Sequence, residues 1–236
     1  MRKSRAIAAA IVIVAIVVVG LVLSNSPGSP PAAPGSNLLV NGGFETGNLR
    51  GWDSGGSLVP SVESTTVQNG TYAARFVTPS NGDALSQCTL HALQCSLLNS
   101  STVSQNVAGI SISPGTQLSI ALYPAFQSPS TFQMTLDFAT ASQQNSKEVT
   151  IYYIFYASSD QCNAYSQLLV NGSQYARAFC LSAQQGEWSV ITRSLSDDLP
   201  AAVSPSSLHN SGMTISLSFA GGNATDTTYV DSVSLR

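Results

Sequence analysis

The sequence predicts an all-β protein, a β-sandwich or jelly roll, preceded by an apolar N-terminal helix and a short linker. Three observations support this expectation: alternating apolar and polar segments recur, polar turns separate them, and no stretch sustains a helical period. Strands that alternate in this way bury one face and expose the other, which two packed sheets allow. A sandwich or jelly roll is therefore the expected architecture.

The first residues predict export and attachment to the cell membrane. A basic end at 1–5 precedes an uncharged apolar run at 6–23, close to the ~20 residues that a membrane-spanning helix needs. A secretory signal usually has a shorter apolar core of about 7–15 residues, so we expect an uncleaved, single-pass transmembrane anchor. The positive charges before the helix place the following domain outside the cell.

Two alternatives for this segment stay open. Cleavage near Ser24 would release a secreted domain. A cut between Arg5 and Ala6 would resemble the processing of archaeal pilin leaders, after which the helix becomes part of a filament core. In each case the prolines, glycines and serines of 24–36 predict a semi-extended linker before a domain at 37–236.

Four segments show the period of two most clearly: 118–122, 132–138, 147–156 and 213–219. The segment 147–156 differs from the others because both of its faces are partly apolar. Its expected core face carries Val149, Ile151, Tyr153 and Phe155, and its other face carries Tyr152, Ile154 and Tyr156. Such a strand is either covered on both sides or presents an aromatic face to a ligand.

The four cysteines fit an exported domain with two disulfides. Asn171-Gly172 predicts a hairpin turn, and folding the chain there brings Cys162 almost opposite Cys180. By elimination Cys88 pairs with Cys95. Zinc is the competing interpretation, since His91 lies between these last two cysteines, but no fourth ligand is apparent.

The two ends of the domain carry complementary patterns. A short apolar run, 38–40, predicts a first strand, and the residues Asn41-Gly42-Gly43-Phe44-Glu45 then predict a tight turn with a buried ring and a carboxylate. Near the C-terminus, a period of two predicts a last strand with Tyr229, Asp231, Val233 and Leu235 on one face. An aspartate on an apolar face is costly unless it is paired or bound to a cation.

These two ends, with Gly51-Trp52, resemble the carbohydrate-binding modules of the cellulase-associated family 4 and family 9-like group, which are jelly rolls of the galactose-binding-like type. The segments 69–76, 105–115 and 186–188 are similar to the early, middle and late parts of the same modules. The resemblance covers most of 37–236.

The resemblance implies a structural calcium ion where the first and last strands meet. Its ligands would be the Gly43 carbonyl, the Glu45 carboxylate, Asn69, the Tyr72 carbonyl and the Asp231 carboxylate. Oxygen donors of this kind suit calcium. Asn69 departs from the family pattern, since some members have an acid at this position. The alternative to a calcium site is a calcium-free cluster in which both carboxylates bind backbone amides.

The resemblance also implies glycan binding, and the sequence offers one candidate surface. Tyr152 and Tyr156 share a strand face, and Gln133 and Asp137 lie on the polar face of the preceding strand. If the two strands are neighbours, these four side chains line one surface. The alternative is that the two tyrosines pack under a loop. Two further aromatic residues, Trp52 and Trp188, are expected to pack in the core.

Catalysis and nucleic-acid binding are not expected. The charged residues make up 9% of the chain and the net charge is -3, whereas nucleic-acid binding needs a basic face. Asp197-Asp198 is the only adjacent acidic pair, and we expect a solvated turn there. We therefore expect a non-catalytic, membrane-anchored glycan-binding module, with a structural or adhesive surface protein such as a pilin-like or envelope subunit as the alternative. A glycoside hydrolase is the weaker alternative.

Overall fold

The computed structural model describes residues 36–78, 100–126, 130–139, 148–156, 168–171, 174–208, 211–220 and 226–236. All of them belong to the compact unit Pro34–Arg236. The expected anchor at 6–23, almost the whole linker and three of the four cysteines lie outside these ranges. Within the described ranges, no helix combines the length and apolar character that crossing a membrane requires.

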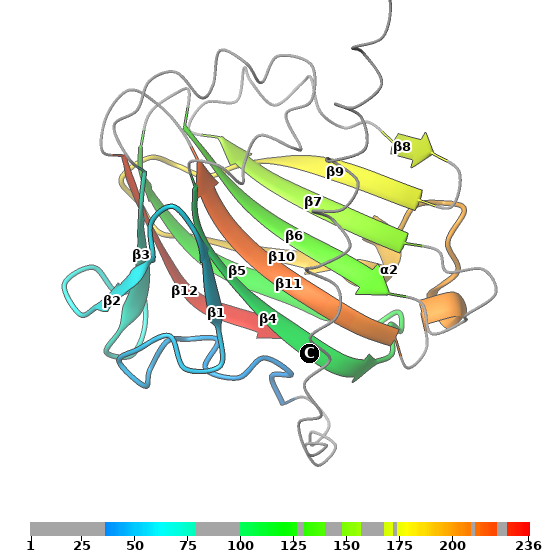
Figure 1. Ribbon diagram of the computed structural model, residues 1–236, viewed down its shortest axis with the longest axis horizontal. Helices are drawn as coiled ribbons and strands as arrows, with labels where there is room; N and C mark the ends of the chain where they lie inside the picture. The colour runs from blue at the N-terminus through cyan, green and yellow to red at the C-terminus, as the bar shows by residue number, and fades with distance from the viewer. Residues whose placement is uncertain are drawn as a thin grey trace, which may run out of the picture. The chain divides into compact units, whose positions relative to one another are not determined.

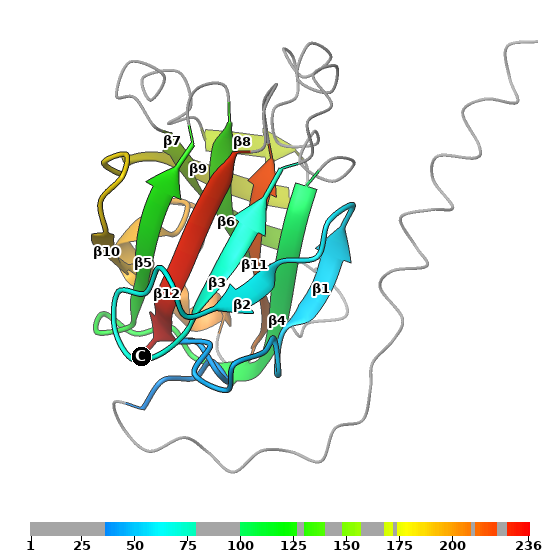
Figure 2. The same ribbon diagram turned by 90° about the vertical axis from the view of Figure 1, so that its left-hand side faces the viewer.

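Two sheets form the described domain (Figure 1, Figure 2). The seven-stranded sheet has the order β1 (Asp53–Gly56), β4 (Ser100–Ile110), β11 (Ser211–Ala220), β6 (Thr131–Ala139), β7 (Glu148–Tyr156), β9 (Gln174–Ser182) and β8 (Leu168–Asn171). The five-stranded sheet has the order β10 (Ser189–Ser194), β5 (Gln117–Ala125), β12 (Thr227–Leu235), β3 (Ala73–Val77) and β2 (Ser61–Glu63). All neighbouring strands in these sheets are antiparallel except β7 and β9. Two short helices, α2 (Leu195–Asp198) and η3 (Pro205–Leu208), follow β10.

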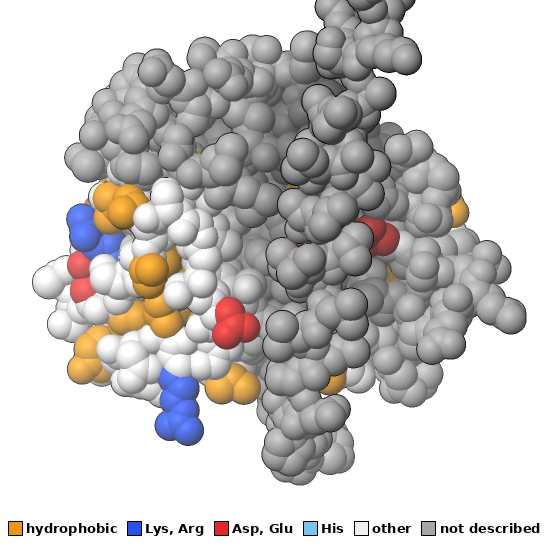
Figure 3. Space-filling view, in the orientation of Figure 1, with side chains coloured by type: hydrophobic (Ala, Val, Ile, Leu, Met, Phe, Trp, Pro, Cys, Tyr) orange, Lys and Arg blue, Asp and Glu red, His pale blue; other side chains and the backbone are white. Residues whose placement is uncertain are grey.

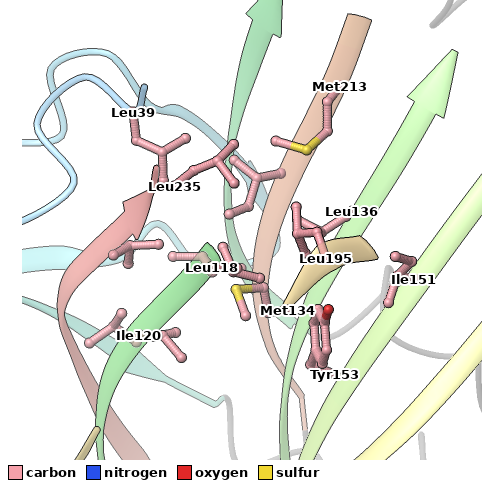
Figure 4. Close-up of a cluster of buried hydrophobic side chains, with 14 of the residues drawn as sticks. Leu39, Leu118, Ile120, Met134, Leu136, Ile151, Tyr153, Leu195, Met213 and Leu235 are labelled. Carbon is pink, nitrogen blue, oxygen red and sulfur yellow. The ribbon is translucent and has the colours of Figure 1, made fainter. Parts of the chain in front are cut away.

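The expected β-sandwich is confirmed, and its core lies between the two sheets. The predicted alternation holds in β5, β6, β7 and β11, whose inward side chains are almost completely buried, among them Leu118, Leu136, Ile151 and Leu217. Figure 4 shows side chains from both sheets meeting in this layer, together with Leu39 from the N-terminal segment. Burial of these faces provides the main stabilisation of the fold.

The predicted hairpin is also confirmed. Strands β8 and β9 are antiparallel neighbours, with Asn171 opposite Gln174. Cys180 on β9 is disulfide-bonded. Cys162 lies outside the described residues, as do Cys88 and Cys95, so the two pairings remain predictions.

The first predicted strand, 38–40, is wrong. This segment runs through turns along the end of the sandwich, and Val40 is 59% exposed. The side chain of Gln105 explains the difference, because it takes the place of a neighbouring strand. Its Oε1 accepts from the amide of Val40 at 2.8 Å, and its Nε2 donates to the carbonyl of the same residue at 2.9 Å.

The single apolar face predicted for the last strand is also wrong. A β-bulge interrupts β12 between Asp231 and Ser234, where Ser232 has a φ of 53°. A bulge inserts one residue and so reverses the alternation beyond it. Tyr229 and Asp231 consequently lie on the outer side of the five-stranded sheet, and Val233 turns into the core.

The predicted solvated turn at Asp197-Asp198 is half wrong. Asp197 is exposed, but α2 turns Asp198 inward, where it is 2% exposed. There it accepts hydrogen bonds on both oxygens from the Arg193 guanidinium and one at 2.8 Å from the Tyr153 hydroxyl. Burial, followed by the nearby carboxylate, raises the pKa of Tyr153, so its hydroxyl stays a donor. A buried charge needs such partners.

Candidate functional site

The two ends of the domain meet beside β12. The amide of Val233 donates to the Gly42 carbonyl at 2.9 Å, and the amide of Leu38 donates to Leu235 at 2.8 Å. The side chain of Asn37 adds two further bonds to this strand. A Cβ on Gly42 would lie 2.1 Å from the Val233 oxygen, so the close approach requires glycine.

Aromatic packing holds the turn that follows. Phe44 is completely buried and stacks on Trp52, with ring centroids 5.6 Å apart. The Trp52 indole donates to the Asn41 carbonyl at 3.2 Å. The structural role expected for Trp52 is confirmed. The turn consequently presents Glu45, the next residue, at the same end of the sandwich.

Two carboxylates bind one loop from opposite ends of the chain. The Glu45 carboxylate accepts from the amide of Thr71 at 3.0 Å, and the Asp231 carboxylate accepts from the amides of Asn69 at 3.0 Å and Gln68 at 3.2 Å. A Cβ built on Gly43 would lie 3.6 Å from Glu45 Cγ and 3.8 Å from Asp231 Oδ1. We call Gly43, Glu45, Asp231 and the loop 68–72 the clasp.

Among the described residues, the charge of Asp231 has no basic partner. The residue is fully buried, and the ion pairs formed between described residues include neither Asp231 nor Glu45. Burial raises the pKa of the Asp231 carboxyl above its usual range, against the lowering effect of the Asn69 amide and its other hydrogen bonds. The clasp therefore concentrates negative charge that a cation would neutralise.

The clasp brings together Gly43, Glu45 and Asp231 from the predicted calcium ligands. The other two residues contribute differently from the expectation, because Asn69 Oδ1 accepts from the amide of Gly70 and the amide of Tyr72 faces Glu45. Each carboxylate oxygen has two lone pairs, so the amide contacts leave capacity for a metal ion. The donor set thus fits a hard cation, although the described residues contain no group of three or more His, Cys, Asp or Glu side chains around one point.

The predicted glycan surface falls on neighbouring strands. In the pairing of β6 with β7, Gln133 lies opposite Ile154, Thr135 opposite Tyr152, and Asp137 opposite Thr150. These residues alternate with the buried core positions, so they belong to the outer face of the seven-stranded sheet. Tyr156 pairs with Thr131 at the end of the same two strands. The four predicted residues consequently share one region of the sheet.

Hydrogen bonds order the polar side chains of this face. Thr150 donates to Asp137 at 2.7 Å, and Gln133 donates to Thr135 at 2.8 Å. Burial raises the pKa of Asp137, the Thr150 bond lowers it, and the charge of Glu148 raises it again. Burial and the Asp137 charge also raise the pKa of Tyr152. Tyr152 is therefore a neutral ring beside a partly desolvated carboxylate.

An apolar cluster adjoins the polar one. Ile154 and Ala178 are 4% and 6% exposed on the outer face, and Tyr152 and Cys180 pack against them.

We call Gln133, Thr135, Asp137, Thr150 and Tyr152 the Tyr152 face. It combines one of the two predicted tyrosine rings with hydrogen-bonding groups, and Thr135 and Thr150 within it are each only 8% exposed.

The structure extends this face beyond the predicted residues. Next to β6, strands β11 and β4 continue it with a row of small polar side chains: Thr214, Ser216, Ser218, Thr102, Ser104 and Asn106. They bond across the strands, Thr214 to Asn106 at 2.7 Å and Thr102 to Ser218 at 3.1 Å. Few charged side chains appear among the described atoms in Figure 3. The period of two in 213–219 was the sequence signal for this row.

The comparisons with known proteins give information on the fold of this chain, through similar solved structures. No family model matches the chain, and no curated protein matches it. Similar solved structures include a family 61 carbohydrate-binding module with β-1,4-galactotriose, at 15% identity and a TM-score of 0.47, covering 85% of this chain and 98% of that one. Another is a family 16 carbohydrate-binding module, at 14% identity and a TM-score of 0.49, covering 85% of this chain and 99% of that one. A third is the xylan-binding CBM22-1 domain of Xyn10C from Paenibacillus barcinonensis, at 12% identity and a TM-score of 0.43, covering 87% and 97%.

Proposed function

We propose that the protein is a non-catalytic glycan-binding module and that the Tyr152 face is its binding surface. The observation that carries the proposal is the placement of Tyr152 beside Asp137 and Gln133 on one outer sheet face. A sugar ring has apolar C–H faces and a polar edge. An aromatic side chain can stack on the first, and carboxylate, amide and hydroxyl groups can bond to the second.

The acids of this face bear on the weaker alternative, a glycoside hydrolase. Asp137 and Glu148 project from adjacent strands on the same side of one sheet. Hydrolysis requires two carboxyl groups that flank the scissile bond, about 5–9.5 Å apart. We assign Asp137 to ligand binding, because the Thr150 hydroxyl donates to it at 2.7 Å and orients its carboxylate on this face.

We further propose that the clasp binds calcium as a structural ion. Asp231, Glu45 and the Gly43 carbonyl would hold it, with the carbonyl groups of the 68–72 loop completing the oxygen shell. The bound ion would supply positive charge to a buried carboxylate that pairs with no basic side chain of the described ranges. Hydrogen bonds from the 68–72 loop to Glu45 and to Asp231 already join the N-terminal turn, the loop and β12.

Attachment to the outer side of a membrane completes the proposal. It rests on the uncharged run at 6–23 behind a basic end and on the linker at 24–36. The disulfide of Cys180 accords with an oxidising location. Membrane fractionation with external protease treatment tests the orientation, since the domain should be digested only from outside.

A glycan array probed with the full chain in detergent tests the binding surface. Tyr152→Ala should weaken binding at least tenfold, or about 1.4 kcal/mol, because it removes the ring. Tyr152→Phe should retain most of the affinity. Thr192→Ala, on the opposite sheet, is a matched surface control. Unchanged binding by Tyr152→Ala would refute this site, and no binding to any glycan by the wild type would favour a structural or adhesive surface protein.

A further inference from the structure

The outer face of the five-stranded sheet carries a row of three aromatic side chains. Tyr123 on β5 lies directly opposite Tyr229 on β12, with ring centroids 5.8 Å apart. Trp188 immediately precedes β10, and its ring centroid lies 5.6 Å from that of Tyr123. Figure 2 shows β10, β5 and β12 side by side on this sheet. We call these three residues the aromatic row.

The aromatic row does not belong to the core. Each ring is partly exposed, and the adjacent residues Leu122 and Val230 are the ones that point inward with no exposed surface. The expectation that Trp188 packs in the core is therefore wrong. The reason is the strand alternation, which turns Trp188 to the same side as Tyr123. Three large aromatic rings in contact with one another on an outer face form a contiguous apolar surface, which is the kind of feature found at interaction sites.

Polar and apolar groups extend the row at its two ends. Beside Tyr229, Arg75 lies in register on β3, and among the described residues its guanidinium pairs with Glu63 alone, through a long contact of 3.8 Å. It therefore has N–H groups that can donate to a ligand. At the other end Val190, on the edge strand β10, is 59% exposed, and Glu187 is exposed beside Trp188. Stacking surface and hydrogen-bonding groups thus occur together, which suits a sugar chain more than a purely apolar partner.

The ring orientations define the form of the ligand. The planes of Tyr123 and Trp188 differ by 56°, and those of Tyr123 and Tyr229 by 74°. Rings tilted in this way cannot all lie flat against one crystalline polysaccharide surface. They can contact successive units of a single chain whose rings turn relative to one another. Because neighbouring strands are about 4.8 Å apart, the row from β10 to β12 spans about 10 Å.

We propose that the aromatic row is a second glycan-binding surface, specific for individual soluble chains, on the sheet opposite the Tyr152 face. Arg75 and Glu187 would bond to the hydroxyl groups of the bound chain. This proposal does not depend on binding at the Tyr152 face. If both surfaces bind, one molecule joins two glycan chains and gains avidity on a polymer that presents many sites.

The two tryptophans provide a direct test. Trp52 is buried and Trp188 is partly exposed, so acrylamide quenching of the full chain in detergent reports mainly on Trp188, and the Trp52→Phe variant isolates it. Soluble xylan, β-glucan and β-1,4-galactan are the probes, with insoluble cellulose as the flat comparison. A soluble chain should protect Trp188 from quenching, and cellulose should not. The Tyr152→Ala variant should retain this protection, which separates the two surfaces.

Substitutions identify the residues responsible. Tyr229→Ala and Arg75→Ala should each lower the affinity measured through Trp188 about tenfold, whereas Thr192→Ala should not. A thermal melt shows whether each variant is folded, and Tyr229→Phe, which keeps the ring, should restore binding if Tyr229→Ala is unstable. The proposal is wrong if none of the soluble glycans protects Trp188. It is also wrong if protection follows protein concentration without glycan, since a second copy of the chain would then occupy the row.

Discussion

Replacing Asp231 by asparagine tests the clasp, because the change removes the charge and keeps the size of the side chain. If calcium binds the folded state alone, the free energy of unfolding rises by RT ln(1 + [Ca]/Kd), about 2.7 kcal/mol at a hundredfold excess over Kd. For a domain of this size that corresponds to a Tm increase of roughly 5–11 °C. The wild type should show this increase, and Asp231→Asn should lose it.

A second effect of Asp231→Asn is independent of calcium. The wild-type carboxylate accepts from the amides of Gln68 and Asn69 through one oxygen. Asparagine can present one carbonyl oxygen to them, but its NH2 group then meets the backbone amide of Ser232, which hydrogen-bonds to the wild-type carboxylate. If the side chain turns, the NH2 group meets the amides of Gln68 and Asn69 instead. A lost bond with a buried partner costs about 1–3 kcal/mol. This cost lowers the Tm equally with calcium and with chelator, so the response to calcium is the diagnostic quantity.

Thermal melts of the full chain in detergent, with calcium chloride or with EDTA, measure both effects. Asp53→Asn is the control, because it removes one exposed carboxylate from β1 and should keep the calcium response. An identical wild-type Tm in calcium and in EDTA would refute the calcium proposal. So would a calcium response of full size in Asp231→Asn.

The raised pKa of Asp231 adds a dependence on pH. Without calcium the folded state holds this proton more tightly than the unfolded state does, so the contribution to stability is present at low pH and is lost as the pH rises through the raised pKa. The difference in Tm between wild type and Asp231→Asn in EDTA should therefore move in favour of the wild type as the pH falls from 7. Calcium should oppose this trend, since it stabilises the ionised form. A difference independent of pH would show that burial does not perturb this carboxyl.

Three further predictions concern the fold. Gly42→Ala should destabilise the protein by about 1–3 kcal/mol, since its Cβ would lie 2.1 Å from a backbone oxygen. Gly43→Ala is the control, because a Cβ there meets its nearest atom at 3.6 Å. Denaturant unfolding should show a lower free energy of unfolding for Gly42→Ala than for Gly43→Ala. Tyr153→Phe removes one bond to the buried Asp198 carboxylate and should cost about 1.5–3 kcal/mol, which the same unfolding experiment measures; a wild-type midpoint would contradict that role. Non-reducing peptide mapping should join Cys180 to Cys162, and a link from Cys180 to either other cysteine would show the hairpin argument to be wrong.

Local patterns in the sequence were enough to predict the class of the fold and much of its strand content. A period of two in 132–138 and 213–219 identified strands with one buried face, because side-chain direction in a strand depends only on the local backbone. The Asn-Gly turn identified the β8–β9 hairpin for the same reason. The glycine-rich turn at Gly42 and Gly43 also indicated a close approach of another segment, although its partner was inferred from a resemblance.

Tertiary contacts decided the features that the sequence left wrong or undefined. Gln105 takes the place of a strand beside Val40. A single bulge at Ser232 separates Tyr229 from the face that it was predicted to share with Val233 and Leu235. The burial of Asp198 depends on Arg193, which lies five positions earlier on a different element. The aromatic row joins Tyr123, Trp188 and Tyr229, which are far apart in the chain. Local periodicity determines which way a side chain points along a strand, but register, bulges and long-range partners determine what it meets there.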